Sequence, residues 1–191
     1  MDPPTVYIEE EPFFTMVLSS VETFKRECFG YIFGRKPSRT RNNFIITSAV
    51  AVQLAKKRRN KEIEQSKLSE RNMKEFFKKY PAIFPVIGDF HSHPEWGSHK
   101  REPTLSSTDM KDMLRGGCPL SVVIKISSIN KDRILWQGTA EGGIRGSLGK
   151  YKFHINILRV TKEGNGDLKE ECFFIQAPAA LKSLNRALGY T

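Results

Sequence analysis

The feature that most constrains the fold is a pair of histidines, His91 and His93, at the end of an apolar segment. Residues 82–93 (AIFPVIGDFHSH) are rich in aliphatic and aromatic side chains, which favours a strand, and Pro85 places its first part at a sheet edge or in an irregular stretch. Side chains two residues apart leave the same face of a strand, roughly 7 Å apart at Cα. The two imidazoles can therefore converge on one metal ion.

A carboxylate must join the two histidines, because a catalytic zinc ion takes about three protein ligands and leaves a position for water. Pro94 is expected to end the strand, and residues 106–114 (SSTDMKDML) then predict a short helix whose first turn presents Asp109. Ser106 and Asp109 also fit an ordinary helical capping box, and the histidines alone could be an ordinary strand pair. Their combination predicts one zinc ion per chain, bound by His91, His93 and Asp109.

Glu27 is the candidate for a second chemical role. It immediately precedes residues 28–34 (CFGYIFG), an apolar segment with glycines at Gly30 and Gly34. A single glutamate at a helix–strand junction is by itself usually a solvated charge. Water bound to zinc, however, needs a carboxylate that is not a ligand, to take its proton and pass it to a leaving amine.

Together these residues resemble the JAMM, or MPN-plus, metalloproteases, which include the proteasome-lid deubiquitinase and archaeal and bacterial relatives. The family pattern is a Glu before a glycine-spaced strand, then H-S/T-H-P, then S-x-x-D, and this sequence supplies all three in that order. The resemblance covers roughly residues 13–126.

The resemblance implies roles for five residues. His91, His93 and Asp109 would be the zinc ligands, Glu27 the general acid/base, and Ser106 a hydroxyl donor to the tetrahedral oxyanion. The substrates would be isopeptide or peptide bonds that follow the flexible C-terminal tail of a ubiquitin-like or small sulfur-carrier protein. The implied partner is such a modifier or its conjugates.

The segment between the second histidine and Ser106 departs from the family pattern. The family usually has seven residues there, whereas residues 94–105 make twelve. A longer loop costs little free energy when its ends are anchored, so the ligand geometry is expected to survive while substrate access changes. His99 in this loop is an alternative ligand. No second Cys/His cluster follows in the sequence, so we expect no second, structural zinc, and His154 is expected to be structural.

The order of elements predicts an α+β fold: an MPN/cytidine-deaminase-like mixed three-layer sandwich, with a curved sheet flanked by helices. At 191 residues the chain fits one domain, residues 1–191. Apolar periodicity from Pro12 predicts a first helix, Ser69 is a candidate N-cap for the second, and the almost purely polar residues 53–65 predict a mobile insertion. The other predicted strands are residues 28–33, 44–52, 120–126, 134–139 and 151–160, and the last helix is 178–188.

The net charge of +10 favours an anionic partner, such as an acidic protein, although a charge run is often only a solvated face. The basic residues concentrate at 35–41 and 56–59. A nucleic-acid-associated JAB module of the RadC type is an alternative, but such sequences resemble H-N-H-P and this chain has Ser92. A noncatalytic MPN scaffold is a third reading, yet such relatives usually lack the ligands that this chain keeps.

The remaining composition points to a cytoplasmic protein without a membrane segment. No apolar run approaches the roughly 20 residues of a membrane helix, and residues 1–11 lack the layout of a secretory signal. Three cysteines without C-x-x-C spacing support neither a disulfide framework nor a thiolate zinc site.

Overall fold

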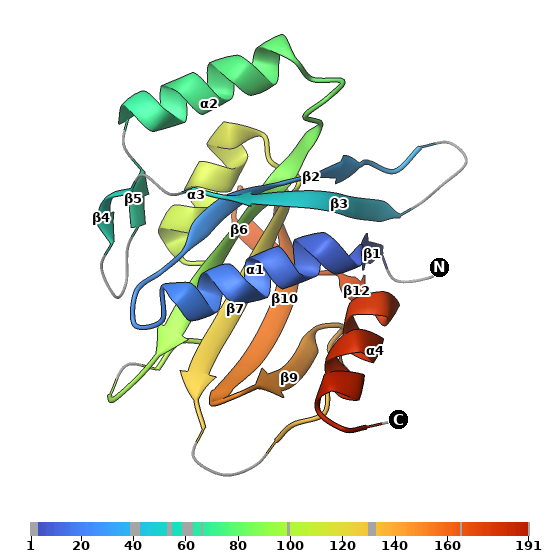
Figure 1. The fold of residues 1–191 in the computed structure, drawn as a ribbon. Helices are drawn as coiled ribbons and strands as arrows, with labels where there is room; N and C mark the ends of the chain where they lie inside the picture. Colours follow the sequence, from blue (N-terminus) through green and yellow to red (C-terminus); the bar gives the residue numbers. More distant parts are fainter. Residues whose placement is uncertain are drawn as a thin grey trace.

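The computed structural model describes residues 4–38, 43–52, 55–58, 63–65, 67–98, 100–129, 133–164 and 166–190. Its helices are α1 (Glu10–Glu22), α2 (Lys67–Lys79), α3 (Ser107–Gly116) and α4 (Pro178–Ala187). Its strands are β1 (Thr5–Ile8), β2 (Phe29–Arg35), β3 (Phe44–Ala51), β4 (Ala55–Arg58), β5 (Ile63–Gln65), β6 (Val86–Glu95), β7 (Leu120–Ser128), β8 (Gln137–Gly138), β9 (Ile144–Leu148), β10 (Tyr151–Lys162), β11 (Leu168–Cys172) and β12 (Phe174–Gln176). The predicted α+β class is confirmed: one curved sheet with helices packed against it (Figure 1).

The sheet is mixed, with the strand order β12-β1-β3-β2-β6-β7-β10-β9-β8, and β11 pairs with β10. β6 lies in the middle of this order, antiparallel to β2 and parallel to β7. The main core lies on one face, where α1 and α4 pack, and includes Phe13, Phe90, Trp136 and Phe153. Because side chains alternate along a strand, the neighbours of Phe90 in β6 face the opposite side.

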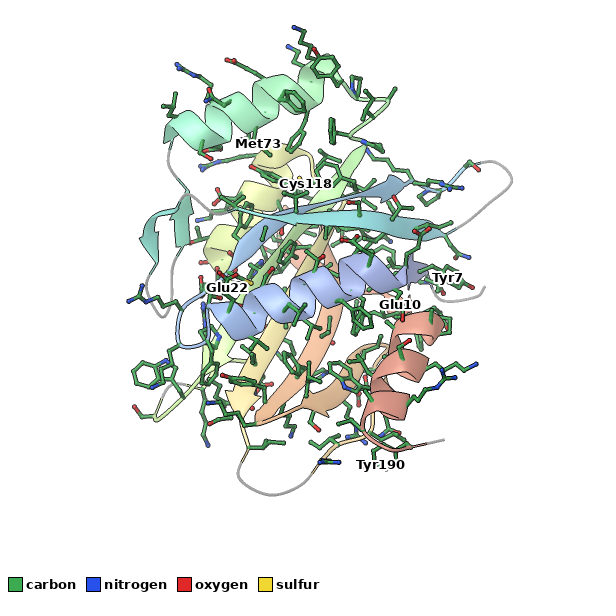
Figure 2. All side chains as sticks on the ribbon, viewed as in Figure 1. Tyr7, Glu10, Glu22, Met73, Cys118 and Tyr190 are labelled. Carbon is green, nitrogen blue, oxygen red and sulfur yellow. The ribbon has the colours of Figure 1, made fainter. Side chains whose placement is uncertain are left out.

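The opposite face carries α2 and α3 over two smaller apolar clusters. Met73 and Phe77 of α2 pack against Tyr31 and Phe33 of β2, and Met73 lies on the side of α2 that faces the sheet (Figure 2). A separate cluster forms between α3 and the strands β7 and β10: Leu105, Met113, Val123 and Leu158. Asp89, His91 and His93 of β6 belong to neither cluster.

Two predictions about the strands are wrong. Pro94 does not end its strand: β6 continues to Glu95 and pairs with β7 as far as that residue, whereas its pairing with β2 covers Val86–His91 and ends there. A proline without an N–H is tolerated there because β6 has only one paired neighbour beyond Ser92. The other error is residues 134–139, of which only Gln137–Gly138 is a strand.

Trp136 explains the second error. Its ring lies in the core, and its backbone N–H and carbonyl pair with the side-chain amide of Asn185 in α4 rather than with a strand. Trp136 is therefore buried without being paired in a strand.

The remaining boundaries differ in smaller ways. α1 begins at Glu10 rather than Pro12, and α2 begins at Lys67 rather than after Ser69, within the usual uncertainty of helix ends. The short strands β1, β9, β11 and β12 were not predicted. Residues 53–65 contain the hairpin β4–β5, and the rest of that segment lies outside the described residues, so the predicted mobility stays a prediction. Residues 39–41 of the first basic run also lie outside the described residues. No described helix has the length and apolar character needed to cross a membrane.

Gly34 allows β2 and β3 to approach closely. A Cβ at this position would lie 1.9 Å from the carbonyl oxygen of Ile45, at the point where the β2–β3 register shifts. We expect Gly34→Ala to lower the free energy of unfolding by about 1–3 kcal/mol, because a backbone atom would have to move. Gly164→Ala, at a position with nothing near the added carbon, is the control in urea denaturation. Equal stability of the two variants would contradict this account.

Candidate metal centre

His91 and His93 project from the same face of β6. His91 pairs with Phe29 of β2 on one side and with Val123 of β7 on the other, so the backbone of β6 is fixed at this point. Both side chains are buried, and their ring centroids lie 5.0 Å apart. The predicted convergence of the two imidazoles is therefore observed.

Asp109 reaches the histidines from the first turn of α3. Its Oδ2 accepts a hydrogen bond from the backbone N–H of Ser106 (2.8 Å) and lies 3.8 Å from Nε2 of His91. The hydroxyl of Ser106 in turn accepts from the N–H of Asp109 (3.2 Å). The capping box and the ligand are thus not alternatives, because the box holds the carboxylate beside the histidines.

The three side chains could hold a metal ion. One ligand atom from each of His91, His93 and Asp109 lies within 4.8 Å of the others. Nε2 of His91 is buried and has no hydrogen-bond partner among the described residues, an arrangement that is costly unless another group pairs with it. Two imidazole nitrogens and one carboxylate oxygen form a donor set that suits zinc, so the residues fit the ion.

The far side of each imidazole is also occupied. Nδ1 of His93 lies 2.9 Å from the carbonyl oxygen of Glu102, which can only accept, so Nδ1 carries the proton and Nε2 keeps a free lone pair. Asp89 Oδ1 lies 3.8 Å from Nδ1 of His91 and accepts a hydrogen bond from the Ser121 hydroxyl (2.7 Å). Such partners orient metal-binding histidines and raise their basicity.

Sequence reasoning missed Asp89 and Glu102. The position of Asp89 was available in the sequence, because it lies two residues before His91 and so on the same face of the strand. Glu102 contributes a backbone carbonyl, which no residue type could have signalled.

Glu27 lies between α1 and β2 and is 5% exposed. The next residue, Cys28, donates its backbone N–H to the hydroxyl of Ser92 (2.8 Å), and the N–H of Ser92 donates to the carbonyl of Cys28 (3.1 Å). Ser92, between the two histidines, therefore fixes the segment of Glu27 to β6. One carboxylate oxygen of Glu27, Oε1, forms an ion pair with Nη1 of Arg101.

The geometry agrees with the family comparison. The model of the family described as JAB1/Mov34/MPN/PAD-1 ubiquitin protease matches residues 2–114, more than half of the chain. The chain belongs to this family. Its structure is similar to the solution structure of protein DSY2949 from Desulfitobacterium hafniense, with a TM-score of 0.49, 13% identity, and coverage of 90% of this chain and 93% of that one. A comparison with curated proteins gives no match.

The structure brings most of the predicted site residues of this JAB-family chain together. The structure brings His91, His93 and Asp109 together, with Ser106 bonded to Asp109. The charges of His91 and Asp109 both act on Glu27, so the glutamate lies within electrostatic range of the cluster. His99, the alternative ligand, lies outside the described residues.

The two histidines have pKa values shifted in opposite directions. Burial and the neighbouring charge of His91 lower the pKa of His93 to about 4. Burial also lowers the pKa of His91, but the carboxylates of Asp89, Asp109 and Glu27 outweigh it, and the net shift is upward. Burial acts to raise the pKa of Asp109, yet the charge of His91 and the hydrogen bonds of Ser106 hold it below its usual value.

Metal affinity should therefore depend on one proton between about pH 4.5 and 6.5. In this window His93 is already neutral, whereas His91 is protonated and must lose its proton to bind a metal. The logarithm of the zinc association constant is expected to fall by about one unit per pH unit as the pH falls. Zinc titrations against a competing chelator measure this slope. A slope of two would contradict the conclusion that His93 is already neutral in this pH range.

Removing the charge of Asp89 should weaken zinc binding. Asp89→Asn removes the carboxylate that orients His91, and we expect a zinc affinity about 10- to 100-fold lower, the usual effect of such outer partners. Asp112→Asn is the matched control, because Asp112 is exposed on α3 and pairs only with Arg115 among the ion pairs observed. An Asp89→Asn variant with unchanged affinity would exclude this role.

Proposed function

We propose that this JAB-family chain is a JAMM-type zinc metalloprotease. It would cleave isopeptide or peptide bonds that follow the C-terminal tail of a ubiquitin-like or small sulfur-carrier protein. The observation that carries the proposal is the presence of a His-His-Asp cluster, with both histidines buried, together with a buried glutamate, Glu27, that is not one of the ligands. A purely structural zinc site is closed by four protein ligands and has no use for such a glutamate.

Zinc, when held by His91, His93 and Asp109, would supply Lewis acidity that polarises the scissile carbonyl and acidifies water. Burial raises the pKa of Glu27, despite the opposing charges of Arg101 and His91. A raised pKa makes a carboxylate a better proton acceptor, as a general base that then becomes a general acid must be. Glu27 would thus carry the proton from water to the leaving nitrogen.

Ser106 would stabilise the developing oxyanion. Its oxygen already accepts the N–H of Asp109, which leaves the hydroxyl proton for another acceptor. Ser106 is also the N-cap of α3, so the positive end of the helix dipole lies at this point. A hydroxyl fixed in this way needs no reorganisation to bind the oxyanion.

The modifier itself would be recognised through its tail, laid beside the site in an extended conformation, where it could add a strand. The net charge of +10 suits an acidic modifier or another acidic protein, and Ser92 argues against a RadC-type nucleic-acid module. We further propose that residues 1–191 form one domain, a three-layer sandwich of the MPN/cytidine-deaminase type, that works in the cytoplasm.

Glu27→Gln tests this function. The variant keeps a neutral group of the same size, so we expect zinc content near one per chain and a cleavage rate about 10²- to 10⁴-fold lower, the usual contribution of general acid–base catalysis. Glu22→Gln, at the exposed end of α1 (Figure 2), is the matched control and should cleave normally. The substrates are a panel of ubiquitin-like conjugates and tail-extended precursors, with products identified by mass. Unchanged cleavage by Glu27→Gln would overturn the assignment.

A further inference from the structure

The loop that follows β6 brings a cation into the candidate site. Arg101 lies in this loop, which is longer than the family pattern, and its Nη1 pairs with Oε1 of Glu27. The Arg101 side chain is 24% exposed and that of Glu27 is 7% exposed, so the pair is largely withdrawn from water.

This position of Arg101 is built by the fold. The next residue, Glu102, bonds through its carbonyl to His93 and through its side chain to Lys125 (3.1 Å), which also pairs with Glu95 (3.5 Å). The carbonyl of Pro103 accepts from the side chain of Asn156 (3.1 Å). Both ends of the loop are therefore tied to the sheet, and Arg101 lies between the anchors.

The ion pair conflicts with the work proposed for Glu27. One oxygen of Glu27 is engaged by a permanent cation, which opposes the protonation that proton transfer requires. A leaving group must also come within hydrogen-bond distance of Glu27, where the guanidinium now lies. Moving Arg101 away without a replacement would break a largely buried pair and leave a cation and an anion unpaired, which is strongly unfavourable.

We propose that Arg101 is a specificity-determining residue. When substrate binds, its guanidinium breaks the ion pair with Glu27 and pairs with a substrate carboxylate in the leaving group, next to the scissile bond. The inference rests on the proposed function, because it is Glu27 that faces the leaving nitrogen. A planar guanidinium binds a carboxylate through two parallel hydrogen bonds, so a substrate with an acidic group replaces the lost pair. The preferred leaving group then carries an acidic side chain, or a C-terminal carboxylate, next to the released amine.

Binding of leaving-side peptides tests the exchange without any cleavage. The probes are Gly-Glu-Gly amide, Gly-Gln-Gly amide and Gly-Gln-Gly free acid, each with a free amino terminus, added to the zinc-loaded protein. The last two differ only in the terminal carboxylate, and the first two only in the side-chain carboxylate. Of the two tryptophans, Trp136 is in the core and Trp96 lies in the loop beside Lys25, so a fluorescence change on binding reports on the loop.

The wild-type protein is expected to bind at least one of the acidic probes about tenfold more tightly than the neutral one, the effect of one charge-assisted hydrogen-bonded contact. Arg101→Gln and Arg101→Met should abolish the preference while retaining zinc. Glu27→Gln should increase it, because the internal competitor for Arg101 is gone. Arg115→Gln, an exposed arginine of α3, should leave the preference unchanged.

A preference that survives in Arg101→Gln, or that does not increase in Glu27→Gln, would overturn the proposal. A cleavage assay distinguishes the proposed role of Arg101 from the proposed protease function on which it rests. The substrates are tail conjugates on a peptide lysine, with Glu or Gln following that lysine. Equal cleavage of the two by the wild type would refute the role of Arg101 alone. An Arg101-dependent binding preference without cleavage of any conjugate would refute the proposed function and keep the carboxylate site.

Discussion

The pairing of β6 with β2 and β7 is the constraint on which the candidate site depends. It fixes a strand in which Phe90 fills the main core while His91 and His93 face the other side. A shift of one residue would bury the imidazoles in the core and expose the phenylalanine, so the apolar packing of Phe90 sets the position of the histidines. The hydroxyl of Ser92, bonded to the N–H of Cys28, then couples this register to the segment that carries Glu27.

The helix α3 positions its ligand, Asp109, through contacts that also stabilise the helix. Its N-terminal N–H groups need acceptors, and the carboxylate of Asp109 and the hydroxyl of Ser106 supply two of them. The helix is held on the sheet by Met113, which packs with Val123 and Leu158. Asp109 is therefore positioned by apolar packing at one end of α3 and by capping at the other.

The sequence predicted the ligand cluster because its signals are local. Two histidines at strand spacing and a carboxylate in a helical first turn are patterns that short-range geometry determines, and the main strands and helices follow from apolar periodicity in the same way. The effect of Pro94 was mispredicted because a proline's cost depends on which neighbours pair with the strand at that point. The strand assignment of residues 134–139 failed because Asn185, about fifty positions later, takes the backbone groups of Trp136. The pairing of Arg101 with Glu27 has no local signal, since 74 residues separate the two.

The energetics of the site favour ligand binding over stability. Two buried groups oppose folding: the imidazole nitrogen of His91, which has no hydrogen-bond partner in the described part of the chain, and the carboxylate of Glu27, whose pKa is raised by desolvation. A chain that used this face only as a scaffold would be more stable with apolar residues at these positions. The surrounding structure instead maintains them: Asp89 and the carbonyl of Glu102 occupy the outer nitrogens of the imidazoles, and Lys125 holds the loop that supplies this carbonyl. The loop after β6 therefore forms part of the site, because it orients one ligand and brings Arg101 to Glu27.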